Sequence, residues 1–129
     1  MKRIGEVALA LGLSVDTLRY YEKIGLVKNI QRNGSGVRCY QENDIARLRF
    51  VKRAQKIGFS LGEIASLLNF RGNPQKAKPL VRELALQKLT ELEQHLKEIT
   101  ALRDELSQLV NLCNATPEGC PILDSFETD

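Results

Sequence analysis

The stretch VDTLRYYEKIG, residues 15–25, decides the predicted fold, because it predicts a short helix directly after another one. Ser14 can cap its first turn and Gly25 can close its last. Its apolar residues recur at helical spacing at Leu18, Tyr21 and Ile24. Residues 4–11 show the same periodicity and stop at Gly12, a residue type that commonly ends helices. Two short helices joined through a glycine form a helix-turn-helix pattern, which also occurs in domains that bind no nucleic acid.

The segment that follows, residues 27–41, predicts a two-stranded hairpin. Asn33, Gly34 and Gly36 lie between two stretches able to form strands, which is a good signal for a tight turn. The hairpin carries the cations Lys28, Arg32 and Arg38. A basic hairpin after a helix-turn-helix is typical of a wing that lies along the phosphate backbone, and the plainer interpretation is a surface hairpin with scattered cations.

Two more helices are predicted before residue 74. The first, from residue 43 to Gly58, turns one apolar stripe inward, at Ile45, Leu48, Val51, Ala54 and Ile57. The second opens with Ser60 and Glu63 at capping-box spacing. Its apolar side consists of Leu61, Ile64, Leu67 and Leu68. We expect residues 1–74 to form one small, mainly helical domain with a wing.

A long helix is predicted from Pro79 to about Leu112, because this stretch contains no other proline and no glycine. Its apolar residues alternate steps of four and three, as in a coiled coil. They are Ala85, Leu89, Leu92, Leu96 and Ile99, continued after a slip by Leu102, Leu106, Leu109 and Cys113. A helix of this length cannot bury such a seam on its own small domain, so we expect a second copy to cover it, parallel or antiparallel. Packing within the chain is the alternative. We assign residues 75–112 to this dimerisation helix and 113–129 to a C-terminal loop and tail.

Charge divides the chain into two halves. Residues 1–82 carry 16 Lys and Arg against 6 Asp and Glu, whereas residues 83–129 carry 3 against 10. The basic half suits a polyanion, because Lys and Arg contacts to phosphates release counterions. No apolar run approaches the roughly 18 residues that cross a membrane, and no secretion signal begins the chain, so we expect a cytoplasmic protein. An enzyme is not expected, because the single histidine, His95, has no nucleophile beside it and no phosphate-cradling loop is present.

The stretch CNATPEGCP, residues 113–121, holds two of the three cysteines. It could form a disulfide, a redox switch, a metal clip or a plain turn. A reducing cytoplasm argues against a permanent disulfide. Pro121 can begin a short helix, which would place Cys120 at a helix N-terminus, where the amide dipoles favour thiolate. The third cysteine, Cys39, is expected to be an ordinary half-buried strand residue.

The motifs TLRYYEKIGLV, GVRCY and KIGFSLGEIASLL, in this order and before a long helix, resemble the MerR family of bacterial transcription regulators. The resemblance covers nearly the whole chain. It implies a winged-helix DNA-binding domain and a homodimer held by antiparallel long helices. It also implies binding to a palindrome in a promoter whose spacer is too long for RNA polymerase, with activation through kinking and untwisting of that DNA when an effector binds.

The resemblance also implies particular DNA contacts. Its Arg-aromatic-Tyr element and the Arg-x-Tyr element of its wing contact phosphates, and they fall here on Arg19, Tyr20, Tyr21, Arg38 and Tyr40. The major groove would face Val15, Asp16 and Thr17. Asp16 stands where a basic residue would be unsurprising, so it either accepts from a cytosine amine or caps the helix. The dimer interface would include Leu89, Leu92, Leu96, Ile99, Leu102 and Leu106.

Metal-sensing members of the family carry a two-cysteine loop after the long helix, which implies Cys113 and Cys120 as ligands. The ending CPIL, residues 120–123, resembles the copper-efflux branch, although the six intervening residues are one fewer than in that branch. Lys78 stands where the family places a metal-selecting residue of the partner's long helix, a cysteine in many divalent sensors and a serine in monovalent ones. Two thiolates around a +1 ion leave a charge of −1, which Lys78 could balance if it does not simply point at solvent.

The leading hypothesis is a homodimeric activator of efflux or detoxification genes that binds Cu(I), or Ag(I) or Au(I), and works with RNA polymerase at the promoter. Two-coordinate sulfur ligation suits these soft ions. One alternative is a thiol-oxidation sensor that joins Cys113 and Cys120 in a disulfide. Another is a divalent-metal sensor of the same family with further ligands. A third is a dimeric interaction module with no DNA role.

Overall fold

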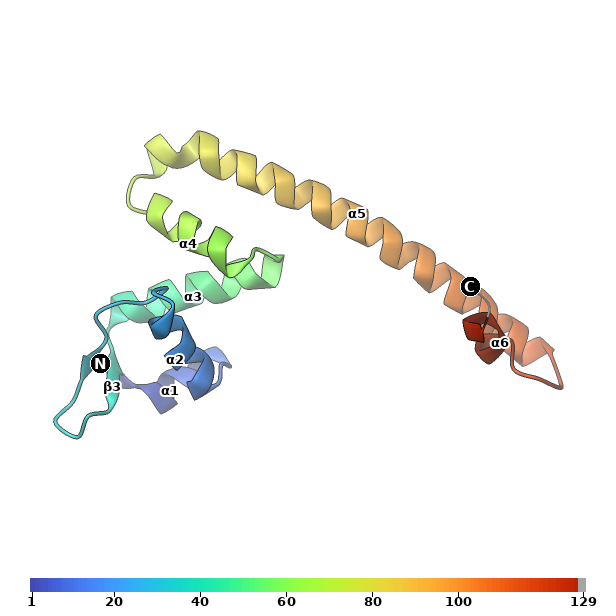
Figure 1. The fold of residues 1–129 in the computed structure, drawn as a ribbon, viewed down its shortest axis with the longest axis horizontal. Helices are drawn as coiled ribbons and strands as arrows, with labels where there is room; N and C mark the ends of the chain where they lie inside the picture. The colour runs from blue at the N-terminus through green and yellow to red at the C-terminus, as the bar shows by residue number, and fades with distance from the viewer. Residues whose placement is uncertain (128–129) are drawn as a thin grey trace. The chain divides into compact units, whose positions relative to one another are not determined.

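Residues 1–127, which the computed structural model describes, form six helices and three short strands (Figure 1). The chain divides into two units, residues 1–81 and 82–129. The elements that begin in the first unit are β1 (Lys2–Arg3), α1 (Ile4–Leu11), α2 (Val15–Lys23), β2 (Gln31–Arg32), β3 (Arg38–Tyr40), α3 (Glu42–Ile57), α4 (Leu61–Phe70) and α5 (Pro74–Ala115). The second unit contains the rest of α5 and α6 (Pro121–Glu127). No helix among the described residues is both long enough and apolar enough to cross a membrane.

The predicted helix-turn-helix is confirmed as α1 and α2. Gly12 ends α1 in the left-handed conformation, at φ 67°, and its amide donates to the Ala8 carbonyl. A residue with a Cβ is disfavoured there, so the glycine allows the sharp turn. Ser14 caps α2, because its hydroxyl accepts a hydrogen bond from the Thr17 amide at 3.0 Å. Both ends of the turn are therefore set by local chemistry.

The wing is larger than the predicted two-stranded hairpin. β2 and β3 pair antiparallel, with Arg32 opposite Arg38, as expected from the turn residues between them. β1 pairs with the other edge of β3, with Arg3 opposite Cys39, so β3 is the central strand of a three-stranded sheet. The two residues of β1 are too few to show an alternating pattern, so this strand could not be predicted from the sequence.

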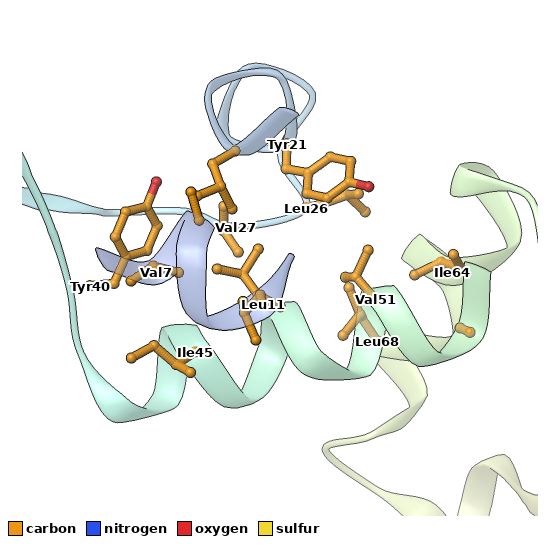
Figure 2. Packing of buried hydrophobic residues seen from close by; sticks show 14 residues of the cluster. Val7, Leu11, Tyr21, Leu26, Val27, Tyr40, Ile45, Val51, Ile64 and Leu68 are labelled. Carbon is orange, nitrogen blue, oxygen red and sulfur yellow. The ribbon is translucent and has the colours of Figure 1, made fainter. Parts of the chain in front are cut away.

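The core of the first unit lies between α3 and the helix-turn-helix. Figure 2 shows side chains of α1, α2 and α3 pointing toward one another, with Ile64 and Leu68 of α4 near one end of α3. The buried residues include Val7, Leu11, Leu18, Tyr21, Leu26, Val27, Tyr40, Ile45, Leu48, Val51, Ala54, Ile64 and Leu68. Two residues expected to face inward do not, because Ile24 and Ile57 are each 42% exposed. Both stand at helix ends, where Gly25 and Gly58 turn the chain away.

Three polar side chains of α3 also attach the helix-turn-helix. The Tyr21 hydroxyl donates to Gln55 Oε1 at 2.6 Å, and Arg47 Nε donates to the Leu26 carbonyl at 2.6 Å. Lys52 donates to the carbonyl of Leu11, the last residue of α1. The predicted capping box of α4 is present as well, since the Ser60 and Glu63 side chains each accept from the other residue's amide. Among the groups bound here, the Leu11 carbonyl and the amides of Ser60 and Glu63 are helix-end groups that lack a partner within their own helix.

The long helix starts earlier and ends later than predicted. α5 begins at Pro74, directly after Asn73, whose carbonyl accepts from the Ala77 amide at 3.1 Å. Pro74 therefore takes the first-turn position that the sequence had suggested for Pro79, and Pro79 lies inside the helix. The helix continues past Leu112 to Ala115. The cysteine loop is correspondingly shorter than residues 113–120, and Cys113 lies in the last turn of α5.

The chain reverses direction after α5 and forms the predicted short helix α6 (Figure 1). Gly119 has a φ of 80°, which a residue with a side chain rarely adopts. The Cys120 carbonyl accepts from the Asp124 amide at 3.0 Å, so Cys120 stands directly before the first turn of α6. The prediction that Pro121 begins a helix is confirmed.

The core assignment predicts different effects for two leucines of the helix-turn-helix. Leu18 is fully buried and Leu9 is 87% exposed. Leu18→Ala should lower the free energy of unfolding by about 2–5 kcal/mol, because it leaves a cavity, whereas Leu9→Ala should change it by less than about 0.5 kcal/mol. Urea titration followed by circular dichroism measures both. Equal effects of the two substitutions would contradict the packing described for α2.

Candidate nucleic-acid interface and cysteine loop

The N-terminal turn of α2 exposes Asp16 more than its neighbours. Val15 and Thr17 are half-buried, and the Thr17 hydroxyl lies 2.7 Å from the Ser14 hydroxyl. The Asp16 side chain is 93% exposed, and its Oδ1 lies 3.4 Å from Nη1 of Arg19. Because Ser14 supplies the helix cap, the interpretation of Asp16 as the cap is wrong. Asp16 and Arg19 thus form an exposed, loosely paired acid and base at the start of the second helix.

The Arg-aromatic-Tyr element of α2 is split between the surface and the core. Arg19 and Tyr20 are exposed, and Tyr20 has 49% of its surface accessible. Tyr21 is only 4% exposed, and its hydroxyl donates to Gln55 on α3. Helical geometry explains the difference, because adjacent residues point about 100° apart. Tyr21 is therefore mainly a core residue, and the phosphate contact expected from its hydroxyl stays a prediction.

The Arg-x-Tyr element of the wing is split in the same way. Arg38 is partly exposed, and its Nε donates to Glu22 Oε1 of α2 at 2.6 Å. Tyr40 is fully buried, and its hydroxyl has no hydrogen-bond partner among the described residues. Burial raises the pKa of this phenol above its usual value, and the nearby Glu22 carboxylate raises it further. Tyr40 is buried because β3 is the central strand of the sheet, and the phosphate contact expected from it stays a prediction.

The tip of the wing is ordered by its turn residues. Asn33 Oδ1 accepts from the amides of Ser35 and Val37, at 2.9 and 3.0 Å. Arg32 Nη1 donates to the Gly36 carbonyl at 3.0 Å. Arg32 and Arg38 stand opposite each other on β2 and β3, so both arginines lie on the same face of the hairpin. Such a pair suits contact with a phosphate backbone.

Glu22 is the residue of this surface that sequence reasoning missed. It connects α2 to β3 through Arg38, and the two residues are 16 positions apart in the chain. A signal was present, because Glu22 is an acid in a strongly basic segment. Its partner could not be identified without the position of β3.

The cysteines occupy two separate places. Cys113 is exposed in the last turn of α5, and Cys120 is half-buried directly before α6, so they flank one reversing loop. Both thiols are free. Cys39 lies in β3, as expected for a strand residue, but it is buried rather than half-buried, with 8% of its surface exposed and its sulfur 3.6 Å from the Val37 carbonyl. Within residues 1–127, no group of three or more His, Cys, Asp or Glu side chains could hold a metal ion.

The apolar seam of α5 is uncovered in the single chain. Its residues have between 42% and 66% of their surface exposed: Leu89, Leu92, Leu96, Ile99, Leu102 and Leu106. A continuous apolar stripe of this length is typical of an interface with another chain. Lys78, near the start of the same helix, is exposed.

Comparison with known proteins agrees with this architecture. The model of the MerR HTH family regulatory proteins matches residues 2–70, and the MerR DNA-binding model matches residues 45–109. The regulator HmrR of Rhizobium leguminosarum bv. viciae is 42% identical over 124 residues, 95% of each chain. The regulator CueR of Escherichia coli O6:H1 is 33% identical and covers 95% of this chain and 92% of its own.

A solved structure gives the same result at the level of the fold. The transcription regulator PbrR691 of Ralstonia metallidurans CH34, in complex with lead(II), superimposes with a TM-score of 0.71 at 35% identity. The match covers 98% of this chain and 99% of that one. The chain described here therefore belongs to the MerR family of helix-turn-helix regulatory proteins, which are DNA-binding regulators of transcription and not enzymes.

Proposed function

We propose that this protein is a metal-responsive transcription regulator that binds promoter DNA as a homodimer. In this proposal it activates efflux or detoxification genes on binding a monovalent soft ion, Cu(I) or else Ag(I) or Au(I). The observation that carries the proposal is the pair of free cysteines, Cys113 and Cys120, flanking the reversing loop after the long helix of a MerR-family chain.

DNA binding is supported by the charge and exposure of the first unit. Residues 1–81 hold 15 of the 19 Lys and Arg residues of the chain. The proposed phosphate contacts are Arg19, Tyr20 and Arg38, which are exposed or partly exposed. Val15, Asp16 and Thr17, at the start of α2, would face the major groove. RNA polymerase at the promoter is the further partner, with activation through distortion of the DNA between its contact points.

A metal effector is supported by the solved relative. PbrR691 was solved with lead(II), and this chain is 35% identical to it over nearly its whole length. In the present chain Cys113 and Cys120 would supply the ligands, because thiolates bind soft ions strongly. A cytoplasmic location, where thiols stay reduced, would keep both sulfurs available.

A monovalent ion is favoured by the small donor set. The described chain offers two thiols in this loop and no cluster of three potential ligands. Two thiolates can hold a soft +1 ion by linear coordination, whereas zinc usually takes four ligands. The −1 charge left on the site would be balanced by Lys78 of the second copy. The ending CPIL, which resembles the copper-efflux branch, points the same way.

The two loop cysteines should be necessary for the response to copper. In reconstituted transcription with reduced protein, Cys113→Ser and Cys120→Ser should each abolish stimulation by Cu(I) while still binding the promoter, because each removes one of two ligands. Cys39→Ser is the matched control and should respond like the wild type, since Cys39 lies in the wing strand. Full stimulation of transcription by Cu(I) with either loop variant would contradict the proposed metal site.

Transcription, metal-binding and DNA-binding measurements on the reduced protein separate the alternatives. Activation by an oxidant that persists when copper is stringently chelated would indicate a Cys113–Cys120 disulfide. Zinc or lead binding with higher stoichiometry and affinity than Cu(I), together with activation, would indicate a divalent sensor. An interaction module without a DNA role would show no salt-dependent binding to any promoter fragment, whereas a regulator should lose affinity steeply as salt rises.

The seam of α5 should hold the dimer. Leu96 is 66% exposed in the single chain, and Leu96→Glu would place a charge inside the proposed interface. We expect this variant to sediment as a monomer at concentrations where the wild type is a dimer, because an unpaired buried charge is strongly destabilising. Leu9→Glu, at an 87% exposed position of α1, is the control and should stay dimeric. A dimeric Leu96→Glu protein would exclude this seam as the interface.

Asp16 should contribute sequence preference rather than affinity. Selection of sites from a random-sequence duplex library should show that Asp16→Ala relaxes the preference at one base pair per half-site, worth about 1–3 kcal/mol. The affinity of the Asp16→Ala protein for unrelated DNA should rise, because a negative charge is removed from the interface. Asp104→Ala, at an exposed position of α5, should leave the preference unchanged. An unchanged preference in Asp16→Ala would show that Asp16 reads no base.

A further inference from the structure

An ion pair joins the second helix of the helix-turn-helix to the wing. Glu22, in the last turn of α2, accepts through Oε1 from Nε of Arg38 on β3 at 2.6 Å. The side chains of Arg38 and Glu22 are 21% and 27% exposed, so water screens the pair only in part. A short, partly buried contact of this kind between charged groups is stronger than a typical surface ion pair.

The charge of Glu22 is unfavourable for a surface that binds DNA. Glu22 lies on the same helix as Arg19 and Tyr20, the proposed phosphate contacts. A carboxylate close to phosphates repels them, and this repulsion weakens binding by an amount that falls as salt rises. Considered as an isolated charge, Glu22 should therefore reduce DNA affinity. Any favourable contribution of Glu22 to DNA binding must therefore come through its ion pair with Arg38.

Arg38 is the group that gains from Glu22. Arg32 stands directly opposite Arg38 across the hairpin, and like charges at paired strand positions repel each other. Arg32 is held by the Gly36 carbonyl, and Arg38 is held by Glu22. Each guanidinium is therefore held by its own acceptor, Arg32 within the turn of the hairpin and Arg38 against α2.

The contact leaves most of the Arg38 donors for another acceptor. A guanidinium has five N–H donors, and Nε carries one of them, so the four on the terminal nitrogens are not used in this hydrogen bond. A terminal pair of donors matches the two oxygens of a phosphate. A free arginine side chain loses considerable rotamer entropy when it is fixed, and fixing it before DNA binds removes that cost from the binding step.

We propose that Glu22 is a positioning residue, which holds the Arg38 guanidinium in the orientation that contacts a DNA phosphate. Glu22 touches no phosphate itself. The inference rests on the proposed DNA-binding function and extends it, because it assigns to an acidic residue a favourable contribution to binding a polyanion.

The test is a double-mutant cycle of Glu22→Ala and Arg38→Ala. Affinity is measured over a range of salt concentrations on a duplex that the protein itself selected from a random-sequence library. With Arg38 present, Glu22→Ala should lower affinity roughly tenfold and reduce the salt slope by about one phosphate contact, and Arg38→Ala should have the same effect. In the Arg38→Ala background, Glu22→Ala should instead raise affinity, because only its repulsion remains. Urea unfolding of all four proteins checks that each is folded.

A positioning role is distinguished by the opposite effects of Glu22→Ala on DNA affinity with and without Arg38. Higher affinity for Glu22→Ala in both backgrounds would show that Glu22 only repels DNA, and an equal loss in both would show a structural role independent of Arg38. Either result overturns the inference alone. A wild-type protein without salt-dependent binding would overturn the proposed function and the inference with it. If Glu22→Ala does not fold, Glu22→Gln replaces it, and the same change of sign is required.

Discussion

The position of α2, the proposed DNA-reading helix, depends on the packing of α1 and α2 against α3. These two helices have 8 and 9 residues, fewer than the roughly 12–15 at which isolated helices become even marginally stable. They persist because Leu18 and Val7 are buried with Leu48 and Val51 of α3, all at 1% exposure or less. The hydrogen bonds from α3 to the helix-turn-helix are directional, so they orient the helices that the apolar packing holds together. α3 thereby fixes which residues of α2 face outward.

The proposed DNA binding, dimerisation and metal binding use regions of the chain with different chemistry. The basic first unit suits DNA, while the α5 seam is apolar and suits a second copy of the chain. The thiols of Cys113 and Cys120, on either side of the loop between α5 and α6, suit a soft ion. A bound ion can change transcription only if it binds more tightly to one DNA-bound state of the dimer than to another. In the proposal, the two cysteines and Lys78 of the second copy supply that difference in binding free energy.

Local sequence signals predicted much of this fold. Helix caps at Gly12, Ser14 and Ser60 and the turn at Asn33 depend on neighbours within a few residues, so they were predicted correctly. The start of α5 was misplaced because Pro74 and Pro79 both suit a first turn. Asn73 decides for Pro74, because its side chain and carbonyl accept hydrogen bonds from the amides of Lys76 and Ala77.

Features that depend on distant pairing were not predictable in the same way. The strand β1 has two residues and is defined only by its partner β3. Tyr21 is buried because α3 packs against α2, and Tyr40 is buried because β3 is the central strand of the sheet. The family motifs therefore predicted which helix and strand carry these residues, but they did not predict how exposed each side chain is. The Glu22–Arg38 pair connects elements 16 residues apart and required the wing to be placed.

The measurement that tests the account most directly is metal competition on the reduced wild-type protein, scored by transcription from a promoter that it binds. Binding alone is insufficient, because any pair of thiols takes up copper. The account predicts that Cu(I) and its congeners Ag(I) or Au(I) activate transcription, and that zinc and lead neither activate it nor displace them. Activation by zinc or lead in preference to Cu(I), or no activation by any metal, would contradict it.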